Sequence, residues 1–261
     1  MKIVVCGAVG RMGQAILSVI DQEEDFLLGA VIDKVSVNAD PRQLEGVTIT
    51  NAMASGIVNG EVVIDFSSPE GTLAILQEAV SQKKPMVIGT TGFTQEEKEV
   101  ITAASKKIPI VLSPNMSVGV NVIFKLLADV ASVLGGDGYD VEIVEMHHRQ
   151  KKDAPSGTAL RMGEVIASAR GTTLPEVGRF SRHGIIGERP NGEIGIQSLR
   201  GGDVVGEHTV YFVGDGERIE IAHRAHSRKH FARGALIAAQ WVVKQKPGLY
   251  DMMDVLNLKK G

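Results

Sequence analysis

Residues 145–160, EMHHRQKKDAPSGTAL, place two adjacent histidines and a run of cations directly ahead of a predicted helix start. The side chains concerned are His147, His148, Arg149, Lys151 and Lys152. Small residues in the first turn of a helix leave backbone N–H groups that can face an anion. A helix N-terminus beside Lys and His side chains suits a dicarboxylate substrate. A histidine can also supply the proton that must accompany hydride transfer near pH 7.

Other interpretations of this segment stay open from the residues alone. A zinc site formed by His147 and His148 is disfavoured, because neighbouring residues on a strand point to opposite faces, and we expect no metal site. A solvated basic loop remains an alternative, as does a plain capping turn at residues 153–157. The segment supports catalysis only if a nucleotide site faces it.

The elements that position these residues begin with alternating strands and helices over the first 115 residues. Apolar runs predict strands at 1–7, 26–33, 61–66, 85–89 and 108–113. Helical spacing of apolar residues predicts helices at 11–22, 69–83 and 94–107. This alternation is typical of βαβ units, so we expect an α/β fold with a Rossmann-like, doubly wound parallel sheet.

Three glycines after the first strand, Gly7, Gly10 and Gly13, form a variant of the dinucleotide-binding fingerprint. The chain must turn sharply there, approach a pyrophosphate closely and pack a helix against the strand, and each task favours glycine. An acid, Asp33, follows the second predicted strand, 20 residues after Gly13, where a carboxylate would meet the adenosine ribose. We therefore expect a dinucleotide on the loop that also contains Ala8, Val9, Arg11 and Met12.

Lys34 leaves the choice of cofactor open. The carboxylate of Asp33 favours NADH, whereas a neighbouring cation can pair with the 2′-phosphate of NADPH. Lys34 can equally be a solvated loop lysine. The residues thus allow NADH, NADPH or both.

Two further loops follow predicted strands and point to the same crevice. They are Gly89-Thr90-Thr91-Gly92 and Ser113-Pro114-Asn115-Met116. Ligands of open α/β sheets bind beyond the carboxyl ends of the strands, so both loops can line the nicotinamide half of the site. As plain turns they would need no further explanation.

After residue 117 the βα alternation stops. A long helix is predicted at 117–134, a strand at 139–148, a helix from Ser156, and strands at 193–200, 201–214 and 217–226. A last helix is predicted at 230–245. We expect a dinucleotide-binding domain at 1–117, completed by 228–261. Residues 118–227 should form a smaller α+β domain with a mostly antiparallel sheet, for substrate binding and oligomerisation.

Consecutive apolar residues at 210–213 put large side chains on both faces of one predicted strand. Only one face can cover the domain's own helices, so we expect a homo-oligomer built through this sheet. A net charge of -3 gives no reason to expect nucleic acid or an anionic membrane as a partner. The single cysteine, Cys6, lies in an apolar run, and neither a signal peptide nor a membrane span is expected. We expect a soluble, cytoplasmic protein.

The segment E-x-H-H-R-x-K-x-D-A-P-S-G-T-A at 145–159 resembles the signature of the 4-hydroxy-tetrahydrodipicolinate reductase family, also called the dihydrodipicolinate reductase family. The likeness covers nearly the whole chain. Its motifs are V-x-G-A-x-G-R-M-G at 5–13, I-D-F-S-x-P at 64–69, V-I-G-T-T-G-F at 87–93, S-V-G-V-N at 117–121, G-E-R-P at 187–190 and D-V-V-G-E-H-T at 203–209.

The resemblance implies a two-domain homotetramer that passes hydride from NADH or NADPH to a cyclic dicarboxylic imine, in the diaminopimelate route to lysine. His147 matches the family's proton donor/acceptor and Lys151 its proton donor, although either residue could protonate the substrate. His148 matches a substrate-binding histidine, and Gly157 with Thr158 matches the backbone pair that holds a carboxylate, next to Ser156. Cofactor contacts match Gly7 to Met12, Asp33, Lys34, Gly89 to Thr91 and Ser113 to Met116.

Two rival functions make different demands on the residues. A nucleotide-sensing protein without turnover would need the glycine loop but not the histidines. An acylating semialdehyde dehydrogenase would need a catalytic cysteine, and Cys6 lies inside the first predicted strand. For the reductase we expect hinge closure near residues 115–120 and 225–228 before hydride transfer.

Overall fold

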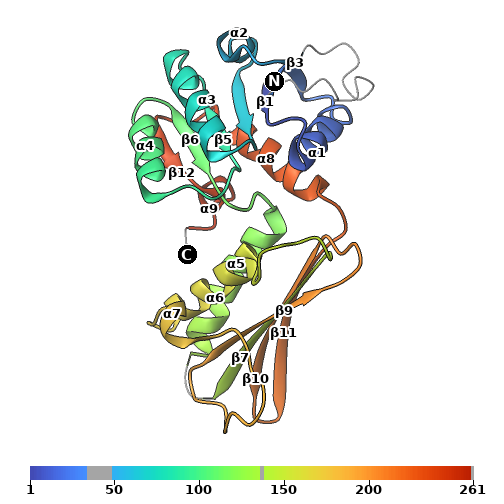
Figure 1. Ribbon diagram of the computed structural model, residues 1–261. Coiled ribbons are helices and arrows are strands. Elements are labelled where there is room, and N and C mark those ends of the chain that lie inside the picture. Colours follow the sequence, from blue (N-terminus) through green and yellow to red (C-terminus); the bar gives the residue numbers. More distant parts are fainter. Residues whose placement is uncertain (34–48, 136–137, 260–261) are drawn as a thin grey trace. The chain divides into compact units, whose positions relative to one another are not determined.

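The computed structural model describes residues 1–33, 49–135 and 138–259 (Figure 1). The chain forms two compact units. Unit 1 consists of Met1–Val118 and Arg228–Gly261, and unit 2 consists of Gly119–Ser227.

Unit 1 contains a seven-stranded sheet in which every paired strand is parallel. In spatial order the strands are β12 (Gly248–Tyr250), β6 (Pro109–Leu112), β5 (Met86–Ile88), β4 (Val62–Asp65), β1 (Lys2–Cys6), β2 (Leu27–Ile32) and β3 (Ile49–Thr50). From β1 the chain builds one half of the sheet through β2 and β3 and the other half from β4 onward. The direction in which successive strands are added to the sheet therefore reverses between β1 and β4. Ligands of such sheets bind at this point.

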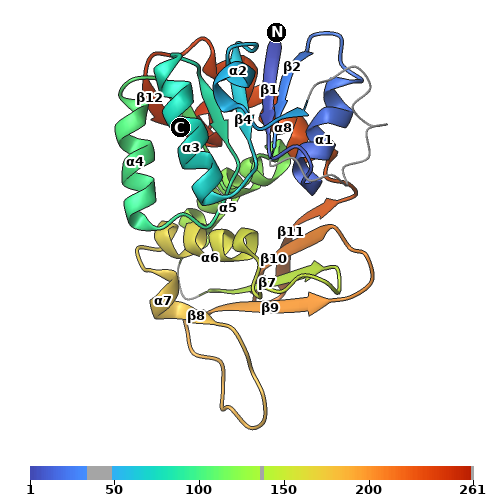
Figure 2. The same cartoon turned by 45° about the horizontal axis from the view of Figure 1, so that its top comes forward.

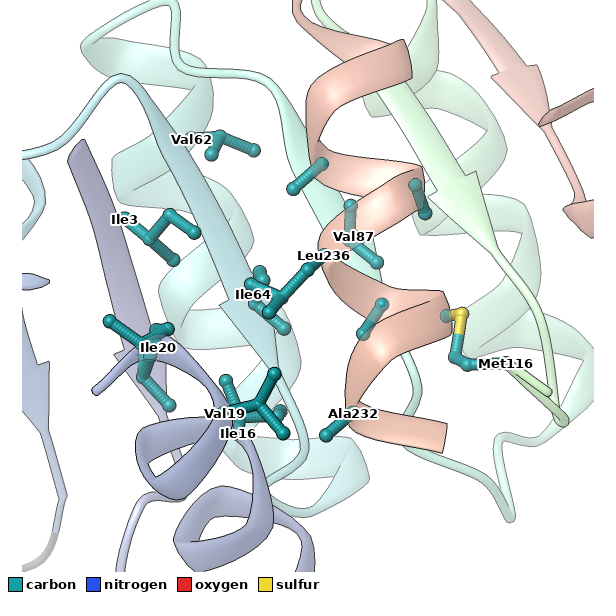
Figure 3. Close-up of a cluster of buried hydrophobic side chains, with 14 of the residues drawn as sticks. Ile3, Ile16, Val19, Ile20, Val62, Ile64, Val87, Met116, Ala232 and Leu236 are labelled. Atoms are coloured by element: carbon teal, nitrogen blue, oxygen red, sulfur yellow. The ribbon is translucent and has the colours of Figure 1, made fainter. Parts of the chain in front are cut away.

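Helices cover both faces of this sheet. Alternate residues of β1 point to opposite faces, so Ile3 and Val5 join one apolar cluster while Val4 and Cys6 join another. The first cluster packs on α1 (Arg11–Ile20), α8 (Lys229–Val242) and α9 (Met252–Val255), as Figure 3 shows for part of it. The second packs on α2 (Met53–Ile57), α3 (Pro69–Ser81) and α4 (Gln95–Ser105). The doubly wound α/β fold expected from the sequence is confirmed.

Unit 2 contains a five-stranded mixed sheet (Figure 2). In spatial order its strands are β11 (Glu217–Ala225), β10 (Gly206–Gly214), β7 (Tyr139–His147), β9 (Ile194–Arg200) and β8 (Gly178–Arg179). Pairs β10–β11 and β10–β7 are antiparallel, whereas β7–β9 and β8–β9 are parallel. The helices are α5 (Val118–Val133), α6 (Gly157–Ala169) and α7 (Leu174–Val177).

One face of the second sheet packs against the helices of the unit. Val141 and Ile143 of β7 and Val210 and Phe212 of β10 are fully buried in a cluster with apolar residues of α5 and α6. The residues that alternate with them on β10, such as Tyr211 and Val213, belong to the opposite face. Polar residues continue the buried rows of the same strands, and they form the candidate catalytic cluster of unit 2.

Candidate active site

The carboxyl ends of the central strands of unit 1 meet at one edge of its sheet. Backbone hydrogen bonds join Gly7 N to Ile32 O, Phe66 N to Cys6 O and Gly89 N to Asp65 O, at 2.9 to 3.1 Å. The loops after these strands therefore lie side by side at the point where the sheet reverses direction. This edge is where a dinucleotide is expected.

Two glycines of the fingerprint are required by close backbone contacts. Gly7 has φ +73°, and a Cβ on it would lie 2.6 Å from the carbonyl oxygen of Phe66. A Cβ on Gly13 would lie 2.3 Å from Cα of Ala8, so only glycine lets α1 approach the end of β1 this closely. The sequence pattern thus corresponds to a tight strand-to-helix turn.

The first turn of α1 is not capped by a side chain: its N-cap is Gly10. By contrast, Ser68 caps α3 and Ser156 caps α6 through their hydroxyl groups. The carboxylate of Asp33 accepts a hydrogen bond from Val9 N at 2.8 Å, which places it beside the loop. A glycine-lined turn, an uncapped helix start and an adjacent carboxylate fit the pyrophosphate and adenosine ribose of a dinucleotide.

The remaining predicted cofactor residues differ in what they can offer. The side chains of Ala8 and Met116 are buried in the apolar cluster, so only their backbone groups can meet a ligand. Thr90 and Ser113 are also buried, and their hydroxyl groups bond to Asp65 and to the carbonyl of Asn115. The exposed members are Val9, Gly10, Arg11, Thr91 and Pro114, with Gly7, Met12, Gly89 and Asn115 half-buried. Lys34 lies outside the described residues.

A buried acid in unit 1, Asp65, had no role assigned from the sequence. Its carboxylate accepts hydrogen bonds from Thr72 of α3, from Thr90 at 3.2 Å and from Ser67 N at 3.1 Å. Burial raises the pKa of Asp65 even though these hydrogen bonds act to lower it. Asp65 thereby ties the end of β4 to α3 and to the loop after β5, and the second of these was expected at the nicotinamide end.

In unit 2 the first residue of the predicted catalytic segment, Glu145, has a fully buried carboxylate. Nδ1 of His147 lies 2.6 Å from its Oε2, and the two terminal nitrogens of Arg200 lie 2.8 Å from its two oxygens. The backbone N–H of Ser156 donates to Oε1 at 3.0 Å, and the hydroxyl group of Ser198 also hydrogen bonds to the Glu145 carboxylate. Burial alone would raise the pKa of Glu145, but the hydrogen bonds from His147, Arg200 and Ser198 outweigh it and hold that pKa well below its ordinary value.

A second histidine, His208 of β10, lies next to His147. Their ring centroids are 5.2 Å apart with the rings nearly perpendicular. His208 is buried and its Nε2 lies 2.9 Å from the hydroxyl of Ser156. Burial, and then the charge of His147, lower the pKa of His208 to about 3. At neutral pH His208 is therefore an uncharged structural partner of the α6 cap.

The loop after β7 is held by the loop before β10. His148 N donates to Val204 O at 2.7 Å, and Arg149 N donates to Gly202 O at 3.2 Å. The ammonium group of Lys151 lies 2.7 Å from the carboxylate of Asp153, and this hydrogen bond lowers the pKa of Asp153. His148 keeps a buried Nδ1 that has no hydrogen-bond partner among the described residues.

The start of α6 follows this loop directly. Ser156 is its N-cap, and its hydroxyl accepts from Ala159 N at 3.2 Å. Both the N–H and the hydroxyl of Ser156 are thus engaged within unit 2, while Gly157 is exposed and has open space where a Cβ would stand. Unit 2 therefore brings together His147, Lys151, Arg200 and the α6 start, a set that can bind a carboxylate and move a proton.

We predict that His208 makes unit 2 sensitive to acid. The unfolded chain takes up a proton on this histidine below its ordinary pKa of 6.5, whereas the folded chain resists doing so down to about 3, so stability falls as pH falls through this window. Between about pH 7 and pH 5 this group should cost about 2 kcal/mol of stability. Urea unfolding followed by circular dichroism should show that, from pH 7 to pH 5, His208→Gln loses less free energy of unfolding than the wild-type protein does. His226→Gln, at an exposed histidine, should keep the wild-type dependence of stability on pH. If His208→Gln lost as much stability as the wild-type protein, His208 would not be the group responsible.

Other kinds of site have little support. No group of three metal-ligating side chains occurs within residues 1–33, 49–135 and 138–259. Burial, and then the charges of Asp65 and Asp33, raise the pKa of the Cys6 thiol, which is fully buried and unsuited to nucleophilic attack. Among the described helices, none is long and apolar enough to cross a membrane.

Comparison with known proteins gives a consistent picture. Family models described as dihydrodipicolinate reductase, N-terminus and C-terminus, match residues 1–116 and 119–256. A protein of Geotalea uraniireducens (strain Rf4), named 4-hydroxy-tetrahydrodipicolinate reductase, is 53% identical and covers 99% of this chain and 100% of its own length. A protein of the same name from Syntrophus aciditrophicus (strain SB) is 51% identical and covers 99% of each chain.

A solved structure is similar over the same extent. Dipicolinate-bound dihydrodipicolinate reductase from Paenisporosarcina sp. TG-14 has a TM-score of 0.79 and 25% identity, covering 97% of this chain and 98% of its own. A Rossmann-type unit in a chain whose relatives are reductases implies a nicotinamide cofactor and an oxidoreductase activity. The resemblance seen in the sequence is confirmed, and the chain belongs to the dihydrodipicolinate reductase family.

Proposed function

We propose that this chain is the NADH- or NADPH-dependent reductase of 4-hydroxy-tetrahydrodipicolinate, a cyclic dicarboxylic imine, and that it forms tetrahydrodipicolinate in the diaminopimelate route to lysine. The single observation that carries the proposal is the His147 imidazole, held by a buried carboxylate within the segment that also starts α6. The names and full-length similarity of the relatives support the same reaction.

The residues of unit 2 have separate tasks in this proposal. The N–H groups of Gly157 and Thr158 hold one carboxylate of the substrate, with Ser156 fixing the helix start. His148 and Lys151 bind the dianion, and His147 supplies the proton that matches the incoming hydride. Lys151 can share this proton donation, since it lies in the same loop.

The residues of unit 1 seat the cofactor, which supplies the hydride when it is bound. The backbone of Gly7 to Met12 faces the pyrophosphate, and Asp33, with Lys34, meets the adenosine ribose. The loops at 89–91 and 113–116 position the nicotinamide. Closure about the segments 115–120 and 225–228 would bring the domains 1–117 and 118–227 together for the reaction.

We also propose a homotetramer in the cytoplasm. On β10, Tyr211 and Val213 belong to the sheet face away from the helices, and Val213 is 39% exposed. Leu199 of β9 is 45% exposed and belongs to the same face. Exposed apolar side chains on one sheet face favour association with further copies of the chain.

The proposed function is tested by following nicotinamide absorbance with freshly prepared cyclic imine. The expected result is oxidation of NADH or NADPH that depends on the imine and is absent with the corresponding saturated dicarboxylic amine. Parallel assays with both cofactors measure the preference. Binding of cofactor without any turnover would contradict the reductase and favour a nucleotide-sensing protein.

A prediction on Asp33 tests the cofactor site separately. Replacing Asp33 with Ala removes the carboxylate that bonds Val9 N and is expected to meet the ribose hydroxyl groups. The KM for NADH should rise roughly tenfold, the energy of about one hydrogen bond to a charged group. The KM for NADPH should rise less, because a repulsion with the 2′-phosphate is removed as well. Equal changes for both cofactors would contradict a ribose contact, and Asp21→Ala, at the other end of α1, is the matched control.

A further inference from the structure

We infer that Glu145, braced by Arg200, is a positioning residue that orients His147 and stabilises its protonated form for proton transfer. The inference deepens the proposed function and rests on it in one respect, that His147 is the proton donor. It stands on the geometry of one unit, since every group involved belongs to unit 2, Gly119–Ser227.

The strand register brings the acid and its partners together. Glu145 of β7 lies opposite His208 of β10 on one side and Ser198 of β9 on the other, while His147 lies opposite Arg200. These positions all belong to the face that packs on the helices. A charged residue there is costly unless it is fully hydrogen bonded, and both oxygens of Glu145 have at least two donors.

A carboxylate whose oxygens are all hydrogen bonded holds the imidazole of His147 in one orientation. Because Glu145 stays ionised, Nδ1 of His147 is the hydrogen-bond donor in the 2.6 Å contact, and the ring presents Nε2 on its other side. Nε2 lies over Gly206, where a Cβ would come within 3.0 Å of it. The acid thus sets the tautomer and the direction of the ring, and the glycine leaves space at the nitrogen that can act on a substrate.

The same arrangement distinguishes the two adjacent histidines. His147 contacts the carboxylate directly, so a positive charge on its ring is compensated. His208 contacts the hydroxyl of Ser156 instead, and it is buried without a carboxylate on its ring nitrogens. Of the two rings, only that of His147 has a counter-charge at hydrogen-bond distance, which makes it the one that can carry a proton.

Other charged groups face His147 and Glu145. They determine whether loss of the Glu145 charge favours or disfavours the protonated form of His147. Arg200 of β9, Lys151 and Asp153 of the following loop, His208 of β10 and, beyond it, His223 of β11 surround His147 and Glu145. The guanidinium group of Arg200 also donates to the carbonyl of Asp153 at 2.7 Å, so it holds the loop and the carboxylate together. If the Glu145 charge is lost, an imidazolium at His147 loses the carboxylate that contacts it and still faces Arg200.

The test compares Glu145→Gln with Glu142→Gln. Glu142 lies on the same strand with its side chain on the opposite face, and its two oxygens bond the two terminal nitrogens of Arg182 at 2.8 Å. Arg189 also donates to Glu142, at 3.1 Å. The control therefore removes the same charge from another arginine-bound carboxylate, with no histidine involved. We expect Glu145→Gln to lower kcat roughly 10- to 100-fold, within the range of general acid catalysis, while the KM for cofactor stays unchanged.

The pH profile separates positioning from a merely structural role. A donor must be protonated, so kcat falls on the alkaline side, and in Glu145→Gln this limb should move to lower pH by about one unit or more. Glu142→Gln should keep the wild-type limb. An alkaline limb at the wild-type pH in folded Glu145→Gln, or an equal loss of kcat in both variants, would overturn the inference.

Two additions keep the outcome decisive. Should Glu145→Gln fail to fold, Glu145→Asp retains the charge but moves it away from His147 by one methylene. Its kcat should fall, while the alkaline limb of its pH profile should stay at the wild-type pH. A wild-type kcat in Glu145→Asp would overturn the inference. Should the wild-type protein show no turnover of the cyclic imine, the proposed function fails while this contact can still be measured. NMR titration of the His147 ring should then show its midpoint at lower pH in Glu145→Gln, and an identical midpoint would contradict the inference.

Discussion

Replacement of His147 by Gln should lower kcat by about 100-fold or more, because the reaction loses its proton donor. Gln keeps a hydrogen-bonding group near the Glu145 carboxylate, which limits structural damage, but it cannot deliver a proton at neutral pH. The dissociation constant for the cofactor should change little, since Gly7 to Met12 and Asp33 belong to unit 1 and His147 to unit 2. Steady-state kinetics together with a fluorescence titration of the reduced cofactor measures both quantities.

His183 provides a matched control for this change, because it is an exposed histidine of the same unit. His183→Gln should leave both kcat and cofactor binding at wild-type levels. If His147→Gln retained activity within a few-fold, the role assigned to His147 would be wrong. A nucleotide-sensing protein would behave in this way, since its output depends on the glycine loop alone.

Lys151→Ala should impair both substrate binding and catalysis. The Lys151 side chain is 18% exposed and its ammonium group lies beside Asp153, near the start of α6. Loss of a charge-assisted contact to a substrate carboxylate should raise the KM for the imine roughly tenfold or more. A shared part in proton donation should lower kcat as well.

The neighbouring Lys152 tests whether position or mere charge is responsible. Lys152 is exposed, so Lys152→Ala removes the same charge from the loop without removing the proposed contact. It should change KM by no more than about twofold, since exposed charges interact weakly through water. A wild-type KM for the imine in Lys151→Ala would exclude the carboxylate contact.

The turn after β1 was largely predictable because local sequence determines it. The turn at Gly7 and the close approach at Gly13 are demands of one strand-to-helix connection, and both glycines lie within seven residues. The spacing to Asp33 follows from the length of one βαβ step, and the hydrogen bond from Val9 confirms that its carboxylate reaches the loop. The exception is Asp65, whose partners Thr72 and Thr90 come from two other segments.

The residues that surround His147 could not be predicted from the local sequence pattern. Glu145, Arg200 and His208 come from three different strands, and only the register of a mixed sheet brings them together. One sign was present in the sequence: Glu145 continues the alternation of Val141 and Ile143, so it falls on the buried face of β7. A charged residue at such a position needs a buried partner, although the sequence does not say which one.

The short strands and helices could not be predicted from the spacing of apolar residues either. The strands β3, β8 and β12 and the helices α2, α7 and α9 have two to five residues each, too few to show an apolar repeat. The parallel pairing of β7 with β9 arises from a long connection that contains α6 and α7, so the second sheet is mixed rather than a simple run of hairpins. None of these elements changes the residues proposed for catalysis.

We propose that an imidazole held by a buried acid protonates a dicarboxylate ring beside a nicotinamide. A crystal structure with oxidised cofactor and pyridine-2,6-dicarboxylate tests it most directly. We expect Nε2 of His147 within about 3.5 Å of the bound ring or its carboxylate, with a carboxylate on the N–H groups of Gly157 and Thr158. A dicarboxylate bound away from α6, or a His147 ring turned from it with both ligands present, would contradict the account.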